Sequence, residues 1–148
     1  MVQAVDVAKY FLCQCDYESG DLISNLKLQK LLYYAQGFHL ALSGSPLFPE
    51  PIEAWKHGPV VPEVYQTFKS YGSNSIPTPD DFDFSVLSQE TSELLDDVYA
   101  VYGQFSAWKL RDMTHDELPW TETASGQTIS LNLMKTYFQT QVVAEDVG

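Results

Sequence analysis

The chain has 148 residues, of which 45% are hydrophobic and 14% aromatic, enough for one domain with a substantial core. Its 20 acidic residues outnumber its 8 lysines and arginines, so the net charge is −12. This excess disfavours direct binding to nucleic acid and to anionic membranes, since both interactions need cationic side chains. It favours attraction to a basic partner, although a solvated acidic surface is the simpler interpretation.

The two cysteines, Cys13 and Cys15, would face different sides of a helix. Neither a disulfide nor a zinc site is therefore predicted, and a reducing, cytoplasmic location is expected. The first residues lack the basic and apolar regions of a signal peptide. No apolar run approaches the length needed to cross a bilayer, so membrane association is not expected.

The first predicted helix covers residues 5–15, and a turn is expected at residues 16–21. A second helix, capped by Ser24 or Asn25, should end at Gly44. Tyr33 flanks the apolar face of this helix, so its ring is expected near the surface. That face consists of Leu28, Leu31, Leu32, Ala35, Phe38 and Leu42.

A proline-rich connection separates the second helix from the third. Three prolines in residues 45–51 exclude a helix, and residues 52–56 are expected to be extended. The dipeptide Gly58-Pro59 is predicted to open the third helix, with Pro62 in its first turn. Gly72 should end that helix.

Residues 73–90 form a polar, acidic connection. Within it, Ile76 is predicted to add a short strand beside the segment that contains Trp55. We therefore expect a small β element near residues 52–60 and 74–77.

The remainder is predicted to be helical, with a mostly irregular stretch at residues 114–127. Ser106 should cap a short helix and Ser130 the last one, while residues 142–148 are expected to form a flexible tail. The fold class is thus mainly α, a single compact helical domain over residues 1–148. The residues predicted to be most deeply buried are Leu31, Leu32, Ala35, Phe68, Leu95 and Trp108.

The sequence contains little that indicates a catalytic or metal-binding site. The three histidines show none of the spacings of metal or nucleophile motifs, so neither a cofactor nor an enzymatic activity is predicted. A small hydrolase or metal-dependent enzyme is the alternative. Its only candidate side chains are His57, Asp112, His115 and Glu117.

Two exposed segments are candidates for partner contact. The first is Trp55, Lys56 and His57, where His57 next to Gly-Pro is also explained by turn structure. The second is an acidic and aromatic strip that begins at Asp80, Asp81 and Phe82, for which a solvated loop is the simpler interpretation. Tyr33 and this strip are expected to lie beside the Trp55 segment, since exposed aromatic residues are frequent interface anchors.

Residues 24–72 read SNLKLQKLLYYAQGFHLALSGSPLFPEPIEAWKHGPVVPEVYQTFKSYG. Later pieces follow in order: Leu94–Tyr99, Ser106–Leu110, Thr114-His115 before Pro119-Trp120, and a closing segment from Ile129-Ser130 to Tyr137-Phe138. Together they resemble the Panacea domain family, formerly a domain of unknown function, typified by SocA-like antitoxins and phage-associated proteins. The resemblance covers nearly the whole chain except residues 73–89 and the end after Gln141.

The resemblance implies a mostly helical domain with a small β element and an antitoxin-type role. Such a protein neutralises a cognate, co-encoded toxin by direct contact. SocA-type relatives also deliver their toxin to a ClpXP-like protease, so a role as proteolytic adapter is implied as well. A phage or mobile-element accessory protein that binds another host factor is the alternative.

Overall fold

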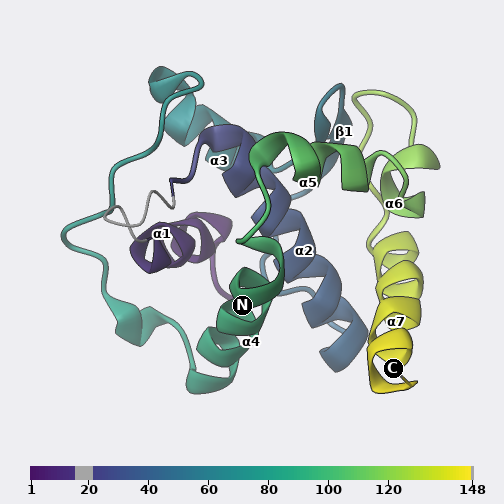
Figure 1. Cartoon of the computed structure of the whole chain (residues 1–148). Coiled ribbons are helices and arrows are strands. Elements are labelled where there is room, and N and C mark those ends of the chain that lie inside the picture. The colour runs from purple at the N-terminus through teal and green to yellow at the C-terminus, as the bar shows by residue number, and fades with distance from the viewer. Residues whose placement is uncertain (16–21, 148) are drawn as a thin grey trace.

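A computed structural model describes residues 1–15 and 22–147, so the turn predicted at residues 16–21 and Gly148 lie outside it. The mainly helical fold with a small β element is confirmed (Figure 1). Its elements in chain order are α1 (Ala4–Gln14), α2 (Asn25–Ser43), β1 (Glu53–Trp55), β2 (Gly58–Val60), α3 (Pro62–Phe68), the 3-10 helices η2 (Lys69–Tyr71) and η3 (Phe84–Val86), α4 (Gln89–Tyr102), α5 (Ala107–Thr114), α6 (Leu118–Thr121) and α7 (Leu131–Val147).

The centre of the fold is α2, which contacts α1, α3, α4, α5, α7 and β2 (Figure 1). The predicted ends of this helix are confirmed. The Ser24 hydroxyl accepts a hydrogen bond from the Lys27 N–H at 3.3 Å, and Gly44 adopts a left-handed φ of 82°. Gly37 lies where α7 comes closest, since a Cβ there would stand 2.1 Å from the Phe138 ring.

Because other elements surround α2, five of its amide and lysine side chains are buried together with its apolar ones. Each of the five forms a hydrogen bond with a backbone atom of a neighbouring segment. The pairs are Asn25 with the Tyr65 carbonyl, Lys27 with the Gly103 carbonyl, Gln29 with the Val61 N–H, Lys30 with the Pro59 carbonyl, and Gln36 with the Leu47 N–H and the Phe48 carbonyl. The helix thus holds the surrounding segments in place.

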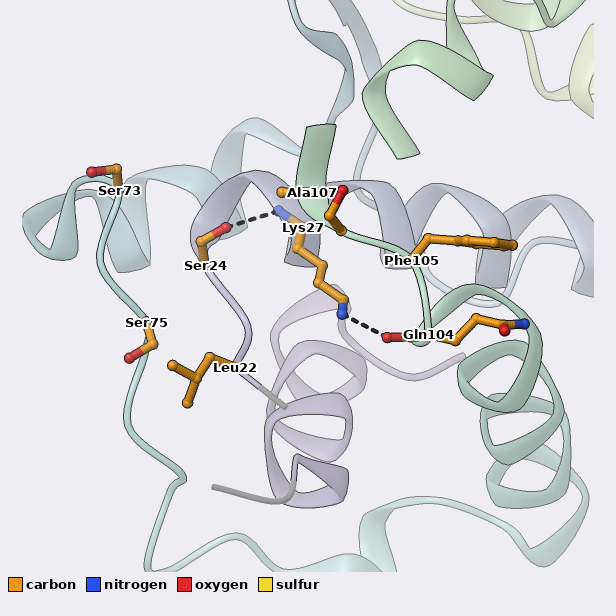
Figure 2. A pocket seen from close by; sticks show the side chains of 10 residues that line it. Leu22, Ser24, Lys27, Ser73, Ser75, Gln104, Phe105 and Ala107 are labelled. Atoms are coloured by element: carbon orange, nitrogen blue, oxygen red, sulfur yellow. Dashed lines mark hydrogen bonds between the residues drawn. The ribbon is translucent and has the colours of Figure 1, made fainter. Parts of the chain in front are cut away.

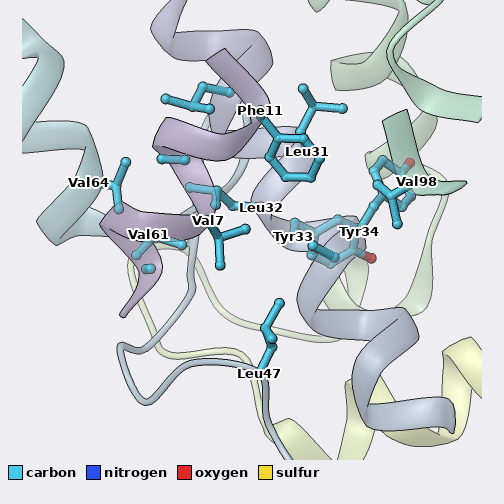
Figure 3. Close-up of a cluster of buried hydrophobic side chains, with 14 of the residues drawn as sticks. Val7, Phe11, Leu31, Leu32, Tyr33, Tyr34, Leu47, Val61, Val64 and Val98 are labelled. Atoms are coloured by element: carbon cyan, nitrogen blue, oxygen red, sulfur yellow. The ribbon is translucent and has the colours of Figure 1, made fainter. Parts of the chain in front are cut away.

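Of the six residues predicted to be most deeply buried, all but Trp108 are buried. Leu31, Leu32, Ala35, Phe68 and Leu95 are buried as expected, and Figure 3 shows the cluster around the first two.

Trp108 and Tyr33 were assigned to the wrong environments. Trp108 is 58% exposed, because α5 packs inward through Leu110 and Thr114 and turns Trp108 outward. Tyr33 is 0% exposed, and its hydroxyl donates to a carboxylate oxygen of Glu117 at 2.9 Å. That hydrogen bond allows the whole tyrosine side chain to be buried.

The β element differs from the prediction in its pairing. β1 and β2 form an antiparallel hairpin in which Trp55 pairs with Gly58, so Lys56 and His57 make the turn. Gly58-Pro59 therefore belongs to a strand, and α3 begins only at Pro62. Gly58 has a φ of 109°, a conformation that glycine adopts without strain.

Ile76 does not pair with the Trp55 segment. Its N–H donates to the Ile23 carbonyl at 2.9 Å, and Ser75 forms an isolated bridge with Ser24. The position beside β1 is taken by a later segment, since the Ile129 N–H donates to the Ile52 carbonyl at 2.8 Å.

Two other regions refine the prediction. The stretch at residues 114–127 contains the short helix α6, with Pro119 near its start. Ser130 caps α7 as predicted, its hydroxyl accepting from the Leu133 N–H at 3.2 Å. α7 extends to Val147, so residues 142–147 are helical. The flexibility expected for this end of the chain stays a prediction. Among the described residues, no helix is both long and apolar enough to cross a bilayer.

Candidate partner-binding site

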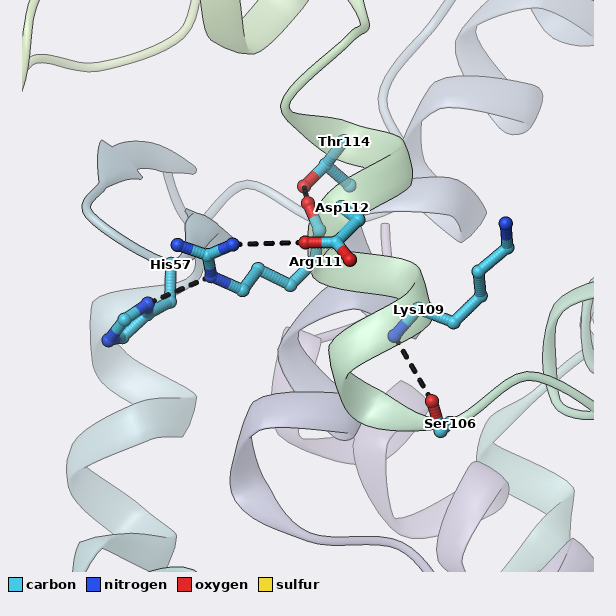
Figure 4. A network of polar contacts seen from close by, with 6 residues as sticks. All are labelled: His57, Ser106, Lys109, Arg111, Asp112 and Thr114. Atoms are coloured by element: carbon cyan, nitrogen blue, oxygen red, sulfur yellow. Dashed lines mark hydrogen bonds and ion pairs between the residues drawn. The ribbon is translucent and has the colours of Figure 1, made fainter.

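The turn of the β-hairpin lies against α5, and together they form the candidate site. The Arg111 Nε–H donates to Nδ1 of His57 at 3.0 Å, which joins the two elements (Figure 4). We call this region the hairpin–α5 surface and define it by its residues, Lys56, His57, Trp108, Arg111 and Asp112.

Trp108 is the largest exposed side chain of this surface. Its ring centroid lies 5.4 Å from that of His57, in an edge-to-face arrangement. The guanidinium carbon of Arg111 lies 5.3 Å from the Trp108 ring centroid, within range of a cation–π interaction. The indole is therefore exposed to solvent and is contacted by His57 and Arg111.

Arg111 is held from two sides. Besides its bond to His57, its Nη1 forms an ion pair of 3.0 Å with the Asp112 carboxylate. Because Nδ1 of His57 accepts a hydrogen bond, the neutral ring carries its proton on Nε2. Partial burial and the charges of Arg111, Lys56 and Lys30 lower the pKa of His57. The surface therefore presents a neutral imidazole beside a fixed guanidinium.

Lys30 supports the hairpin from below. Its Nζ donates to the Pro59 carbonyl at 2.9 Å, and burial, with the charge of Arg111, lowers the pKa of Lys30 to about 7. A Cβ at Gly58 would stand 2.6 Å from Cε of Lys30 and 2.7 Å from Oγ1 of Thr114. Only glycine therefore lets the hairpin approach α2 and α5 this closely.

Two further aromatic residues anchor the other side of the hairpin. The rings of His115 and Trp120 stack at 4.0 Å, and the Trp120 indole N–H donates to the Trp55 carbonyl at 2.8 Å. Burial and the charge of Arg111 lower the pKa of His115. Trp55 itself is half-buried against Tyr65, with ring centroids 5.0 Å apart.

Glu117 lies beneath this region and points towards α2. Its two carboxylate oxygens accept hydrogen bonds from the hydroxyls of Tyr33 and Tyr34 at 2.9 and 2.8 Å. Burial raises the pKa of Glu117 to about 7, and the two tyrosine hydrogen bonds oppose that shift. This buried carboxyl joins α2 to the start of α6 and serves the frame of the fold.

The predicted contact residues are only partly brought together. Trp55, Lys56 and His57 lie on or beside the candidate surface. Tyr33 is buried and was wrongly expected beside them at the surface.

The acidic strip of Asp80, Asp81 and Phe82 was also wrongly placed beside the hairpin. It belongs to the connection near α1, on the other side of the molecule (Figure 1). Phe82 contacts Phe84 at 5.0 Å, and Phe84 contacts Tyr10 of α1 at 5.9 Å. These aromatic contacts fasten the strip to α1.

Sequence reasoning missed Trp108 and Arg111 as surface residues. The signal was present in the helical spacing of α5, where residues 108, 111 and 112 share one face and Leu110 and Thr114 share the other. Giving Trp108 to the core on its size alone overlooked that spacing.

Each of the four residues named for a hydrolase has a partner in the fold. His57 and Asp112 bind Arg111, His115 stacks on Trp120, and Glu117 binds two tyrosines. The residues described also contain no cluster of His, Cys, Asp or Glu arranged to hold a metal ion. Among the described residues, these four side chains thus lie in three separate contacts and not in one shared cluster.

A surface hollow of about 540 Å³ lies beside the start of α5 (Figure 2). Two of its polar side chains already serve the fold. Ser24 caps α2, and the Lys27 ammonium donates to the Gly103 carbonyl at 2.6 Å. These two side chains therefore belong to the frame of the fold.

Comparison with known proteins identifies the protein family. The family described as antitoxin SocA-like, Panacea domain, matches residues 28–121. Antitoxin SocA of Caulobacter vibrioides (strain NA1000 / CB15N) is 37% identical over 123 residues, which cover 75% of this chain and 65% of that protein. No solved structure matches the chain. The hairpin–α5 surface thus lies in a protein that belongs to the SocA-like antitoxin family with a Panacea domain.

Proposed function

We propose that this protein is an antitoxin that neutralises a cognate, co-encoded toxin by binding it directly through the hairpin–α5 surface. Membership of the family supports the antitoxin role. The exposed Trp108, held beside Arg111 and His57, is the observation that supports the surface. Binding would block the toxin surface sterically, without a chemical step.

The composition of the surface suits protein recognition. Tryptophan and arginine are the residues that most often dominate binding energy at protein interfaces. Here His57 and Asp112 hold the guanidinium before any partner arrives, which lowers the entropy that binding would cost. Lys56 adds a cation at the turn of the hairpin.

Two finer points belong to the same proposal. The first is that the protein acts as a proteolytic adapter, delivering its toxin to a ClpXP-like protease in the cytoplasm. The second is an alternative partner: as a phage or mobile-element accessory protein, the chain would bind another host factor through the same surface. Expression of the neighbouring gene alone separates the antitoxin role from this alternative, since a harmless neighbouring gene contradicts the antitoxin role.

The test is neutralisation in cells that express the toxin gene beside this protein's gene. Trp108→Ala and Arg111→Ala are expected to lose protection and to weaken the purified complex by about 2 kcal/mol or more each, as interface anchors do. Isothermal titration calorimetry measures the second effect. Circular dichroism checks that the variants are folded.

Matched control variants lie outside the surface. Phe84 is 52% exposed and aromatic, so Phe84→Ala should protect as well as the native protein. Lys56→Ala should also weaken protection, and Lys69→Ala is its control, because both lysines are exposed. Full protection by folded Trp108→Ala and Arg111→Ala proteins would reject the surface, and the antitoxin role would then need another contact region.

A further inference from the structure

A second exposed surface lies at the other end of α2, where α4 and α7 flank it (Figure 1). The residues that line it form a groove of about 230 Å³. Small-molecule sites usually have roughly 300–1,000 Å³, so the groove suits side chains of a docked polypeptide better than a free ligand. Its main apolar residues are Phe38 and Leu42 of α2, Leu94, Val98 and Val101 of α4, and Val142 of α7.

The groove has the spacing of a helix-binding site. Leu94, Val98 and Val101 stand at positions i, i+4 and i+7 of α4, which places them along one face. Leu42 is 62% exposed and Val101 is 44% exposed, so apolar side chains remain open to water along both walls. Amphipathic helices bind such grooves through their own apolar stripe.

The wall formed by α4 is acidic. The helix contains Glu90, Glu93, Asp96 and Asp97 and no lysine or arginine, and Asp97 lines the groove itself. Asp96 accepts a hydrogen bond from Tyr10 and is engaged with α1. The other three form no ion pair with any lysine or arginine that the structure describes. The rim thus carries negative charge with no counterpart within the described residues.

We propose that this groove binds an amphipathic helix of a partner protein, with an apolar stripe flanked by lysine or arginine. The stripe would lie on the apolar residues of α2 and α4, and the flanking cations would face Glu90, Glu93 and Asp97. A basic partner is what the net charge of −12 favours, and the acidic wall of this groove gives it a place to dock.

A second copy of this chain fits the groove less well. Two copies facing each other through α4 would bring their acidic rims together, and each copy carries a net charge of −12. Like charges across an interface oppose association. The chemistry therefore favours a basic helix over self-association.

The groove is separate from the hairpin–α5 surface. From Lys30, beneath the hairpin, to Leu42 in the groove, the axis of α2 rises about 18 Å. The proposal is therefore independent of the proposed function, and each can fail without the other.

The test uses fluorescence anisotropy with the full-length protein and three labelled helical peptides. One has an apolar i, i+3, i+4, i+7 stripe flanked by lysines, the second has the same stripe flanked by glutamates, and the third is a scrambled form of the first. Only the first is expected to bind, and its affinity should fall as salt rises. Equal binding of all three, or binding of none at millimolar concentration, would overturn the proposal.

Matched variants locate the binding site. Val101→Ser should weaken the basic peptide about tenfold, the loss expected for one apolar contact of this size. Val86→Ser is the control, since Val86 is 46% exposed and does not line the groove. Asp97→Asn should weaken binding and reduce its salt dependence, whereas Asp80→Asn should not. Native affinity in both groove variants would overturn the site.

Sedimentation measurements address the other occupant. The native protein is expected to stay monomeric in the absence of peptide. A dimer that Val101→Ser converts to a monomer would show that a second copy occupies the groove, and the proposed basic helix would then be wrong.

Discussion

The helices α2 and α5 both contain polar, aromatic and aliphatic residues, but they differ in which of these side chains are buried. α2 buries two lysines, two glutamines and two tyrosines, whereas α5 exposes its tryptophan and keeps Leu110 inside. The difference is the number of packed faces, since several elements surround α2 while α5 packs through one side. Burial in this fold therefore follows position more closely than residue chemistry.

What makes the burial possible also differs between the two helices. The polar groups of α2 find backbone partners, as Gln36 does with Leu47 and Phe48. On α5, Arg111 finds its partners at the surface, in His57 and Asp112. The first arrangement fixes the frame, and the second leaves charged and aromatic groups available for binding.

The largest effect should come from truncation on α2. Leu32→Ala is expected to lower the free energy of unfolding by about 2–5 kcal/mol, because it leaves a cavity in the centre of the core. Urea denaturation measures this change. Leu131→Ala is the control, since Leu131 is exposed and should change stability by about 0.5 kcal/mol or less. Equal effects of the two would show that α2 is not the central helix.

The next effect concerns the buried carboxyl that α2 holds. Burial raises the pKa of Glu117 from 4.5 to about 7, so the folded state binds this proton more tightly than the unfolded state. The resulting stabilisation is complete below pH 4.5 and is lost as the pH rises through about 7, a change of about 3 kcal/mol. Denaturation of the native protein and of Glu117→Gln at several pH values measures it.

Glu117→Gln should remove this part of the pH dependence while keeping an oxygen acceptor for the tyrosines. Glu122→Gln changes an exposed carboxylate and should leave it in place. Burial lowers the pKa of Lys30 from 10.5 to about 7, so between these values the unfolded state binds a proton that the folded state does not. Stability therefore falls as the pH drops from about 10.5 to about 7. An unchanged pH profile in Glu117→Gln would mean that the carboxyl is not buried.

A smaller loss is expected from a buried polar group of α2. Gln36→Leu keeps the size of the side chain but leaves the Leu47 N–H and the Phe48 carbonyl without their partner. The cost should be about 1–3 kcal/mol in the free energy of unfolding, measured with urea. Gln89→Leu, at an exposed position, serves as the control. A stabilised Gln36→Leu protein would argue against the anchoring role of α2.

The smallest effect on stability should come from α5. Trp108→Ala is expected to cost less than about 1 kcal/mol, because its ring is mostly in water. Leu110→Ala, two residues away on the inner face, should cost about 2–5 kcal/mol. Thermal denaturation of both variants compares the two faces directly. If Trp108→Ala were as costly as Leu110→Ala, the assignment of α5 faces would be reversed.

Helix ends could be predicted because their signals are local. Ser24, Ser106 and Ser130 each accept a hydrogen bond from the N–H three residues further along the chain, and Gly44 supplies the left-handed end. Such contacts depend only on residues close in the chain.

The pairing of the β element could not be predicted in the same way. Pro59 argues against a strand, since it lacks the N–H for a ladder, but a two-stranded hairpin tolerates it. Ile76 pairs with Ile23, which is distant in sequence, and no local pattern specifies that choice.

The candidate site was half predictable. The segment from Trp55 to His57 stands out by its composition, and it does reach the surface beside α5. Tyr33 was misplaced because its burial depends on Glu117, which is 84 residues away. The hydrophobic periodicity of a helix does not show that one of its hydroxyls will bind a carboxylate far away in the sequence.

The anchors that α2 provides have a consequence for how such a protein can vary. Its polar side chains bind peptide groups, such as the carbonyls of Pro59, Tyr65 and Gly103, and each residue type offers a carbonyl. Substitutions in the loops therefore keep these anchors as long as the backbone follows the same path. Exposed contact residues such as Trp108 and Lys56 can therefore change to suit a new partner, while Gly58 and the helix beneath the hairpin stay the same.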